Sequence, residues 1–421
     1  MADRLKILVA TDVDPTVVIG GSERALVGQL DELVIRGHHI SVVTRAQAGR
    51  PLLETTSQGY NVVRYPMPSG MGAVDLIKAL SIIRRTTCDA IVRDSPDILY
   101  LQQPLAGAGA IMARGRRAIP TVYQFHSPWP DEYRLRLPRA AANQSSPEET
   151  LLSRTEKIKF QLRRKIEGYA LGRSHRILTL SRFMRERCRM LHDLPETRFS
   201  VIPGGVDVEH FRQYADRDQI RRRLRIGEGD DLILTVRNLE PRMGLANLIE
   251  AMPLILRTRP RAVCIIGGSG ELAATLKAQV CAIGLEEHVR FTGFIPEDQL
   301  PEYYAAADLF VLPTTALEGF GMVTVEALAC GTPVLGTPVG ATPEILELLD
   351  SALLLRGVEP AEIARGCLAF LERPQNEKHE LRSICRNYAV KRYSWPSVTA
   401  RIEESLMEAL NSTKSASQRI A

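Results

Sequence analysis

The sequence predicts an α/β protein made of two domains, each built on a parallel β-sheet. Short apolar segments alternate with longer amphipathic ones along almost the whole chain, which is typical of strands that alternate with helices. Several apolar segments run into a glycine-rich turn that opens the next helix, as in βαβ units. The length of 421 residues exceeds one ordinary core and favours two domains of about 200 residues each.

Composition narrows the class of protein. An apolar fraction of 45% and a charged fraction of 24% are those of a soluble globular chain, and a net charge of +5 gives no reason to expect a nucleic-acid partner. The seven cysteines have no paired spacing, so we expect reduced thiols and neither a disulfide framework nor a zinc site. No apolar run is long enough for a transmembrane helix, and the first residues do not form a signal peptide. A cytoplasmic protein is the expectation.

The first βαβ unit covers the N-terminal residues. Residues 6–11 read as a buried strand and 23–35 as a helix, and the next strand begins near residue 38. The pair Gly20-Gly21 lies just before this helix. These glycines either let the backbone approach a ligand or only permit a tight turn, and the sequence leaves both interpretations open.

Further strands are expected at 61–65, 98–102 and 120–126, with a helix at 76–85 between the first two. His126 ends its strand, and ligands bind at the carboxyl ends of strands in parallel sheets. The alternative is a histidine that packs against Trp129.

The segment that follows is expected to be a mobile loop over 130–149, and then a basic helix over 151–171. Lys and Arg greatly outnumber acidic residues over 151–190. This surface either meets an anionic lipid or acceptor, as a peripheral membrane contact, or is an ordinary solvated helix face.

The second domain begins with a strand over 231–237 that ends in Arg237, a candidate phosphate ligand, with Arg242 shortly after it. Residues 262–273 read as strand, glycine-rich turn and helix, with Gly268 in the turn. The turn also matches the Gly-x-Gly-x-x-Ala dinucleotide fingerprint, so an NAD-dependent oxidoreductase is an alternative from another class. The next strand, 289–294, is followed by Ile295.

The stretch from residue 308 to 333 carries the strongest functional signal. A strand over 308–313 leads to Glu318, and a helix that starts near Met322 contains Glu326. The residues between are Gly319, Phe320 and Gly321, and Val323 follows Met322. A helix N-terminus favours an anion, and two flanking carboxylates suit hydroxyls on both sides of a diphosphate, as in a nucleotide sugar. The alternative is that both glutamates are ordinary polar residues.

The run from Glu318 to Val334 resembles the donor-site signature of the retaining glycosyltransferases of family four, which have the GT-B fold. The resemblance implies two Rossmann-like domains that face a central cleft. It implies an N-terminal acceptor domain over 1–203 with a returning helix at about 395–410, and a nucleotide-sugar domain over 207–390. The remaining tail, 411–421, is expected to be disordered.

The same resemblance gives roles to individual residues. Glu318 would contact the donor sugar, Glu326 the ribose and Arg237 the diphosphate, while His126 would lie beside the anomeric carbon without acting as general base. The remaining donor-site residues that it implies are Gly20, Gly21, Gly268, Phe294, Ile295, Gly319, Phe320, Gly321, Met322 and Val323. The family's usual phosphate-binding lysine is Met243 here, and we hypothesise that Arg242 supplies the second cation.

The expected activity is therefore metal-independent hexosyl transfer with retention, from a nucleotide sugar and without a further cofactor. A UDP-sugar is favoured over a GDP-sugar, and the acceptor is a sugar, a lipid-linked molecule or a small molecule. A cytoplasmic location with possible peripheral contact at the inner membrane surface follows. A retaining disaccharide phosphorylase and a sugar-nucleotide epimerase share the fold and remain alternatives, and a non-catalytic carbohydrate-binding protein is a weaker one.

Overall fold

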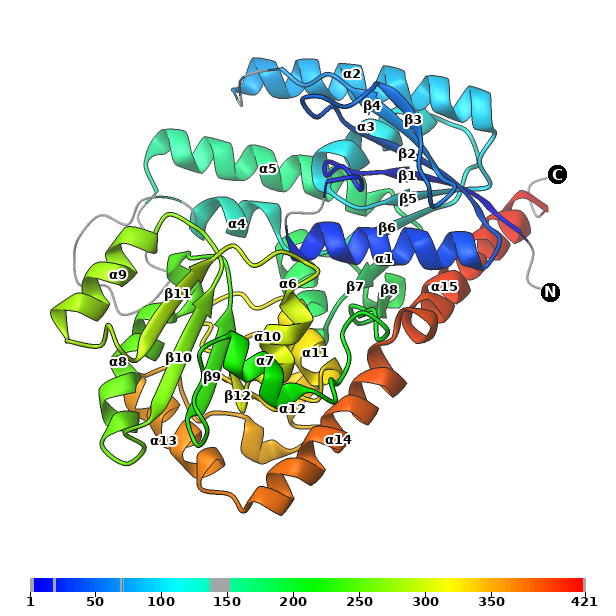
Figure 1. Ribbon diagram of the computed structural model, residues 1–421. Coiled ribbons are helices and arrows are strands. Elements are labelled where there is room, and N and C mark those ends of the chain that lie inside the picture. Colours follow the sequence, from blue (N-terminus) through cyan, green and yellow to red (C-terminus); the bar gives the residue numbers. More distant parts are fainter. Residues whose placement is uncertain are drawn as a thin grey trace. The chain divides into compact units, whose positions relative to one another are not determined.

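The computed structural model describes residues 4–17, 20–68, 70, 72–135, 137 and 152–418. The chain divides into two compact units, whose elements are labelled in Figure 1. Unit 1 comprises Met1–Gly204 and Trp395–Ala421, and unit 2 comprises Gly205–Ser394. Unit 1 is therefore discontinuous in sequence, because the C-terminal segment belongs to it.

Unit 1 is built on an eight-stranded sheet in the order β3-β4-β2-β1-β5-β6-β7-β8. The short β3 pairs antiparallel with β4, and the other described pairings are parallel. In chain order the strands are β1 (Lys6–Ala10), β2 (His39–Arg45), β3 (Leu53–Thr55), β4 (Asn61–Tyr65), β5 (Ile98–Leu101), β6 (Thr121–Phe125), β7 (Arg176–Thr179) and β8 (Phe199–Val201).

The helices of unit 1 cover both faces of this sheet. They are α1 (Gly21–Ile35), α2 (Ala73–Asp94), α3 (Pro104–Arg114), α4 (Trp129–Leu135), α5 (Arg154–Gly172), α6 (Arg182–His192) and α15 (Trp395–Gln418). Figure 1 shows α1 and α2 on opposite sides of the sheet. The helices α2, α3 and α5 pack in succession on one side, while α15 packs on α1. Crossovers therefore leave β1 and β5 in opposite directions, which makes the gap between these strands a topological switch point.

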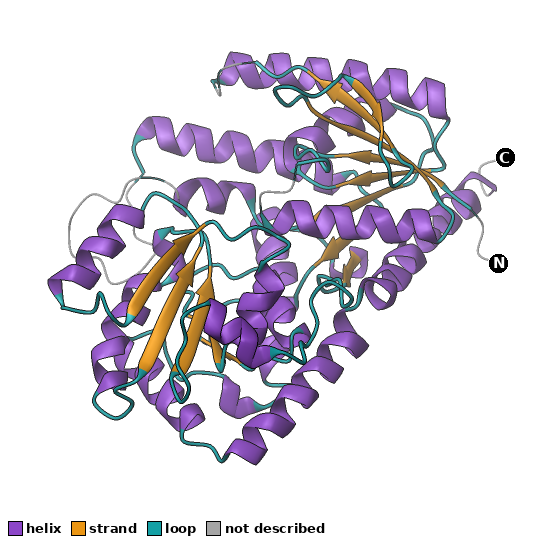
Figure 2. Cartoon of the chain, viewed as in Figure 1, coloured by secondary structure: helices purple, strands orange, loops and turns teal. Residues whose placement is uncertain are grey.

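Unit 2 repeats the plan with a five-stranded parallel sheet in the order β11-β10-β9-β12-β13 (Figure 2). Its strands are β9 (Asp231–Val236), β10 (Ala262–Gly267), β11 (Val289–Gly293), β12 (Leu309–Leu312) and β13 (Val334–Gly336). Its helices are α7 (Arg217–Arg223), α8 (Leu245–Leu256), α9 (Ala273–Ala282), α10 (Leu300–Ala306), α11 (Met322–Ala329), α12 (Thr342–Leu346), α13 (Pro360–Leu371) and α14 (Gln375–Tyr393). The switch point of this sheet lies between β9 and β12.

Several inner strands are buried along their whole length. Every residue of β5, β10 and β12 is buried, because helices cover both faces of the sheet. These strands accordingly appear in the sequence as continuous apolar runs without alternation. The predicted α/β class with parallel sheets is confirmed.

The last helix joins unit 1 through a close approach to α1. A β-carbon built on Gly28 would lie 2.0 Å from the Trp395 ring, so only glycine admits the indole. Arg36 bonds Glu403 at 3.0 Å and the Pro396 carbonyl at 2.7 Å, and His38 contacts Glu403 at 3.1 Å. These contacts dock α15 on α1.

Two expectations about irregular segments need correction. The helix α15 continues to Gln418, whereas a helix end near 410 and a disordered tail were expected. No proline or glycine interrupts 411–418, and the Ser412 and Thr413 hydroxyls bond the Ala409 carbonyl along the helix. Residues 419–421 lie outside the described residues.

The start of the expected loop at 130–149 is the helix α4. The Glu167 carboxylate accepts the Trp129 N–H at 2.9 Å and Arg187 bonds Asp131 at 2.7 Å, so tertiary contacts hold this first turn. Proline is tolerated there because the first helical N–H groups have no intrahelical acceptor. Residues 136 and 138–151 lie outside the described residues, and the expectation of a mobile loop there is not addressed.

Candidate functional site

The switch point of unit 2 carries the residues with the strongest chemical signal. Arg237 follows β9 directly, and Pro313 and Thr314 follow β12 directly. The chain then turns through Glu318 into α11. In open parallel sheets this crevice is where ligands bind, because the two loops diverge and leave the strand ends accessible.

Arg237 is held among buried acceptors. Its Nη2 lies 2.6 Å from Glu318 Oε2, 2.8 Å from Met243 Sδ and 3.2 Å from Thr314 Oγ1. One Nη carries two hydrogens, so at most two of these three contacts are made at a time. The Arg237 Nε has no hydrogen-bond partner among the described residues. The guanidinium thus keeps its positive charge at the strand end, with one buried N–H that no described acceptor receives.

Glu318 is fixed from several sides. Its carboxylate receives the Thr314 hydroxyl at 2.8 Å as well as Arg237, and only 6% of the residue is exposed. The Ala341 N–H donates to its backbone carbonyl at 2.9 Å, and a β-carbon on Gly340 would lie 2.2 Å from that oxygen. The loop in front of α11 is therefore rigidly placed.

The turn into α11 depends on left-handed backbone at two residues. Gly321 caps the helix with φ +89°. Leu317 has φ +53°, which is unusual for a residue other than glycine or asparagine. The first N–H groups of the helix, at Met322 and Val323, have no acceptor within the helix and point out of its start. Together with Gly319 in the turn, these are the backbone groups at which the sequence predicts an anion.

Phe320 has a different role from its neighbours. Its side chain is buried and packs edge-on against Tyr393 at 5.7 Å. Any ligand contact at this position therefore comes from the backbone. The ring anchors the turn to the end of α14.

Glu326 lies in the second turn of α11 and is 1% exposed. Its Oε2 accepts the Tyr304 hydroxyl at 2.9 Å. Both glutamates of the stretch are thus buried carboxylates held by hydrogen bonds, which argues against the interpretation that they are ordinary polar surface residues.

Arg242 lies beside the site. Its Nη1 donates to the Leu317 carbonyl at 3.2 Å, and its Nε is 3.7 Å from Glu240. The side chain is partly buried on the loop that carries Glu318. Met243, the residue at the family's usual lysine position, instead packs its thioether on Arg237.

The remaining predicted residues of unit 2 lie on the neighbouring strand ends. Gly268 has φ +122°, and a β-carbon there would lie 1.9 Å from the Arg237 carbonyl. Gly270 is similarly crowded by Leu239, so close packing of two loops accounts for these glycines without a dinucleotide. After β11, Phe294 is 62% exposed whereas Ile295 is buried.

Unit 1 holds the other two predicted features at the carboxyl edge of its own sheet. Gly20 caps α1, which begins at Gly21, and residues 18 and 19 lie outside the described residues. His126 follows β6, and its Nε2 is 2.9 Å from Gln102 Oε1. Burial lowers the pKa of His126 to about 4, so the imidazole is neutral at ordinary pH.

Other side chains at this edge were not singled out from the sequence. The Tyr100 hydroxyl lies 2.9 Å from Gln29 and 3.0 Å from Gln124. Asp12, directly after β1, accepts the Ala106 N–H at 3.0 Å and the Tyr65 hydroxyl at 3.2 Å, and burial raises its pKa. Its place two residues past a strand was the signal available in the sequence.

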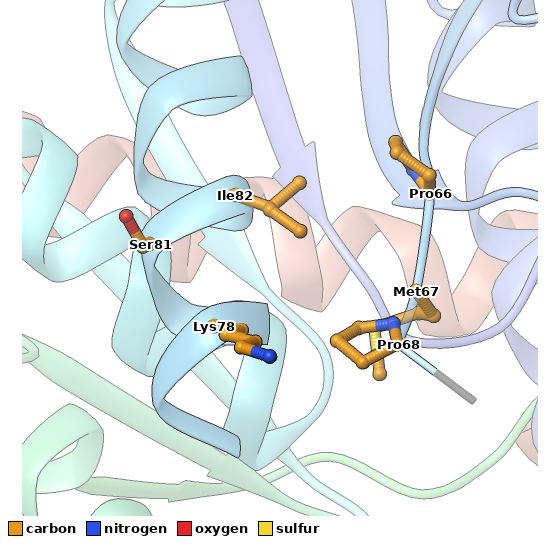
Figure 3. A pocket seen from close by; sticks show the side chains of 6 residues that line it. All are labelled: Pro66, Met67, Pro68, Lys78, Ser81 and Ile82. Carbon is orange, nitrogen blue, oxygen red and sulfur yellow. The ribbon is translucent and has the colours of Figure 1, made fainter. Parts of the chain in front are cut away.

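A pocket of about 470 Å³ opens elsewhere in unit 1 (Figure 3). It lies between the segment after β4 and one side of α2, and no predicted site residue lines it. The lining side chains are mostly apolar, and Lys78 contributes one ammonium group. Such a lining could bind a ligand with an apolar part next to a negative charge. The lining residues are Pro66, Met67, Pro68, Lys78, Ser81 and Ile82.

Two protein-family models match successive parts of the chain. "Glycosyltransferase Family 4" matches residues 19–210, and "Glycosyl transferases group 1" matches residues 216–392. The boundary between the two matches falls close to the boundary between units 1 and 2.

Several curated relatives are mannosyltransferases by name. The "Phosphatidyl-myo-inositol mannosyltransferase" of Mycobacterium tuberculosis is 27% identical over 390 residues, which cover 91% of this chain and 92% of that protein. The "GDP-mannose-dependent alpha-(1-6)-phosphatidylinositol monomannoside mannosyltransferase" of the same organism is 30% identical over 219 residues, or 50% of this chain. That match spans only 56% of the relative's length.

Solved structures share the fold at lower identity. Sucrose-phosphate synthase from Thermosynechococcus elongatus has a TM-score of 0.81 at 19% identity, with 97% of this chain and 100% of that chain covered. HepE from Anabaena, solved with UDP-glucose, has a TM-score of 0.72 at 22% identity, with 96% and 100% covered.

Proposed function

This chain belongs to the family-four glycosyltransferases and has their GT-B fold, and we propose that unit 2 binds the nucleoside diphosphate of the sugar donor at the switch point between β9 and β12. One observation carries the proposal. Arg237 and Glu318 meet at 2.6 Å from opposite sides of that switch point, and α11 begins just after Glu318 and contains Glu326.

The chemistry follows from what each group offers. Arg237 places a fixed positive charge beside the diphosphate, and a charge-assisted bond from its guanidinium to a phosphate oxygen would have a net contribution of about 1.5–3 kcal/mol. The start of α11 adds N–H groups and its dipole as negative charge develops on the departing diphosphate. Glu318 orients sugar hydroxyls and Glu326 the ribose hydroxyls.

We propose transfer with retention and without a metal ion, as the resemblance implies. The proton of the acceptor hydroxyl then goes to the leaving phosphate. A histidine with a pKa of about 4 is a weak base at neutral pH, which supports a hydrogen-bonding role for His126. With Nε2 engaged by Gln102, Nδ1 is the atom that can meet a sugar hydroxyl.

For the donor we propose GDP-mannose. The support is the name of a relative, the GDP-mannose-dependent mannosyltransferase of Mycobacterium tuberculosis, whereas the resemblance alone favoured a UDP-sugar. The test incubates the chain with GDP-mannose and UDP-glucose separately, with membrane lipid extract as acceptor, and measures the nucleoside diphosphate released. Release with neither donor contradicts the proposed function, and release with UDP-glucose alone contradicts the proposed donor.

Further experiments test the metal dependence and the stereochemistry and distinguish a transferase from an epimerase or a phosphorylase. Activity that persists in EDTA supports metal independence, and NMR of the product gives the anomeric configuration. A sugar-nucleotide epimerase would alter the donor without any acceptor. A phosphorylase would require free phosphate instead of an acceptor alcohol.

For the acceptor we propose a lipid-linked, anionic molecule reached by peripheral membrane contact. The outer side of α5 exposes cations around Ile158, which is itself 67% exposed, and each cation near an anionic surface contributes about 1 kcal/mol. The exposed cations of α5 are Arg154, Lys157, Lys159, Arg164 and Lys165. Among the described helices none is long and apolar enough to cross a bilayer.

Vesicle sedimentation tests this contact. Wild type is expected to bind vesicles that contain phosphatidylglycerol and not pure phosphatidylcholine, and Lys157→Glu with Lys165→Glu should abolish the binding. Arg116→Glu with Lys391→Glu makes the same charge change at exposed residues outside α5 and is the control. Equal losses in both double variants would contradict a specific role for α5.

A further inference from the structure

Tyr304 is fixed in the core of unit 2 by its backbone, its ring and its hydroxyl. It lies in α10 and is 0% exposed. The Thr332 hydroxyl donates to its carbonyl at 2.6 Å. Its ring packs between Phe211 at 6.0 Å and Phe310 at 5.5 Å. The hydroxyl then donates to Glu326 Oε2 at 2.9 Å.

This arrangement controls the orientation of a carboxylate. The terminal torsion of a glutamate is broad and has no strong preference of its own. A hydrogen bond from a rigid phenol to one oxygen selects one orientation of the carboxylate plane, and the bond is charge-assisted and buried. The second oxygen is thereby placed by the protein before any ligand arrives.

We propose that Tyr304 is a positioning residue that aims Glu326 at the vicinal hydroxyls of the donor ribose, and so makes the site selective for ribonucleotides. The inference rests on the proposed function, because it takes Glu326 as the ribose ligand. A site that holds a fixed acceptor for a substrate hydroxyl binds the analogue without that hydroxyl less tightly, because the hydrogen bond to the ligand is lost.

The test compares GDP with 2′,3′-dideoxy-GDP by calorimetry, with UDP and its dideoxy analogue as a second pair. Wild type should bind the ribonucleotide about 100-fold more tightly than its dideoxy analogue, in the range seen when a buried polar partner is lost. Tyr304→Phe keeps the ring in its packing and removes only the hydroxyl. It should weaken ribonucleotide binding about 10-fold and leave the dideoxy analogue within about 2-fold of wild type.

Two controls separate positioning from general loosening. Tyr303→Phe removes the hydroxyl of the neighbouring, partly exposed tyrosine of α10 and should change neither affinity. In a Glu326→Gln background, where selectivity is already reduced, Tyr304→Phe should add less than about 2-fold. With turnover, Tyr304→Phe should raise the donor KM and leave kcat within about 3-fold.

The outcomes are distinct. Equal loss of affinity for ribonucleotide and dideoxy analogue in Tyr304→Phe, or no loss for either, overturns the inference while the proposed function stands. If wild type binds neither GDP nor UDP, the proposed function fails, and the inference fails with it. Selectivity lost in Tyr304→Phe and kept in Tyr303→Phe is the expected result.

Discussion

The carboxyl edges of the two sheets carry different chemistry. In unit 2 the edge is ionic, with the buried pair Arg237 and Glu318 and the buried carboxylate of Glu326. In unit 1 the part of the edge at β5 and β6 carries neutral groups, the Gln102 amide and an imidazole, His126, that burial keeps uncharged. The carboxyl group of Asp12 and the buried ion pair of Asp14 with Arg64 lie farther along this edge, after β1 and at β4. Both sets stand at the ends of parallel strands, so the topology alone does not distinguish them.

The difference shows how two parallel sheets of similar topology can bind two kinds of ligand group, a diphosphate and a hydroxyl. Fixed charges in a dry site stabilise a diphosphate strongly, because they need no reorganisation as charge develops. Neutral donors and acceptors recognise hydroxyls without attracting anions. The comparison therefore matches unit 2 to the nucleotide and unit 1 to an alcohol, and the four predictions below test it.

The largest effect is expected from Arg237→Ala. The variant removes the positive charge at the carboxyl edge of the unit 2 sheet and leaves the buried Glu318 carboxylate without its partner. Turnover, measured as release of the nucleoside diphosphate, should therefore fall about 10²–10³-fold. Arg365→Ala is the control, since Arg365 is exposed and, among the described residues, forms an ion pair with Glu362 on the surface of α13. Turnover of Arg237→Ala near the wild-type value would contradict the assignment of the ionic edge to the diphosphate.

A second ionic cluster in unit 2 lies at the opposite end of β12. Asp308 contacts Arg217 at 2.5 Å, Arg221 at 3.0 Å and the Leu232 N–H at 2.8 Å. Asp308→Asn should destabilise unit 2 by about 2 kcal/mol at pH 7, because two cations lose their partner. Both tryptophans belong to unit 1, so the loss should appear in urea unfolding followed by circular dichroism and not in tryptophan fluorescence.

The pH dependence of this cluster has a definite sign. Burial would raise the pKa of Asp308, but Arg217, Arg221 and the Leu232 N–H outweigh it and lower that pKa below 3.8. A lowered carboxyl pKa gives stability that is full above the ordinary value and is lost as pH falls through the lowered one. The difference between wild type and Asp308→Asn should therefore persist at pH 5 and shrink below pH 4; a constant difference would contradict the ion pairing.

Gly28→Ala tests whether α15 completes unit 1. Its new methyl would meet the Trp395 ring, and overpacking should cost unit 1 about 1–3 kcal/mol in urea unfolding followed by tryptophan fluorescence. At Gly172 a β-carbon meets nothing within 4 Å, so Gly172→Ala serves as the control. Donor binding in unit 2 should be unchanged in both variants, and an equal loss of stability in both would contradict the packing argument.

The smallest effect is expected from protonation of His126 in unit 1. Because the folded pKa of His126 is lowered to about 4, the unfolded chain binds a proton first, and unit 1 loses stability as pH falls from about 6.5 towards 4. The loss should reach about 1–2 kcal/mol at pH 5 in tryptophan-monitored unfolding. The His126→Gln variant has no imidazole to protonate, so its free energy of unfolding should change less over this pH range. An equal pH dependence in wild type and variant would show that another group causes the loss of stability.

Sequence patterns predicted the fold, and they singled out Arg237 and Glu318, which meet at the switch point of unit 2. The reason is that these patterns are local. A buried strand between two helix layers is a continuous apolar run, and the turn from β12 into α11 uses glycines at fixed positions next to Glu318. Such signals lie within about twenty residues of one another, where periodicity and turn chemistry can be recognised.

Residues that contact the site from distant parts of the chain could not be predicted from local sequence patterns. Thr314, Met243 and Tyr304 act through contacts with residues that other elements bring near, and nothing in their own neighbourhood marks them. The helix α4 was mistaken for loop for the same reason, since its first turn is held by Glu167 on α5. The extent of α15 was underestimated because a polar composition was taken as disorder, although it contains no helix breaker.

The discontinuity of unit 1 has a consequence for synthesis on the ribosome. Residues 205–394 form one contiguous body, and β-bridge partners Val206 and Ser394 bring its two ends side by side. Unit 1 can therefore be completed only after all of unit 2 has been synthesised. Until α15 is made, the surface of α1 around Gly28 lacks the Trp395 ring that covers it in the folded unit.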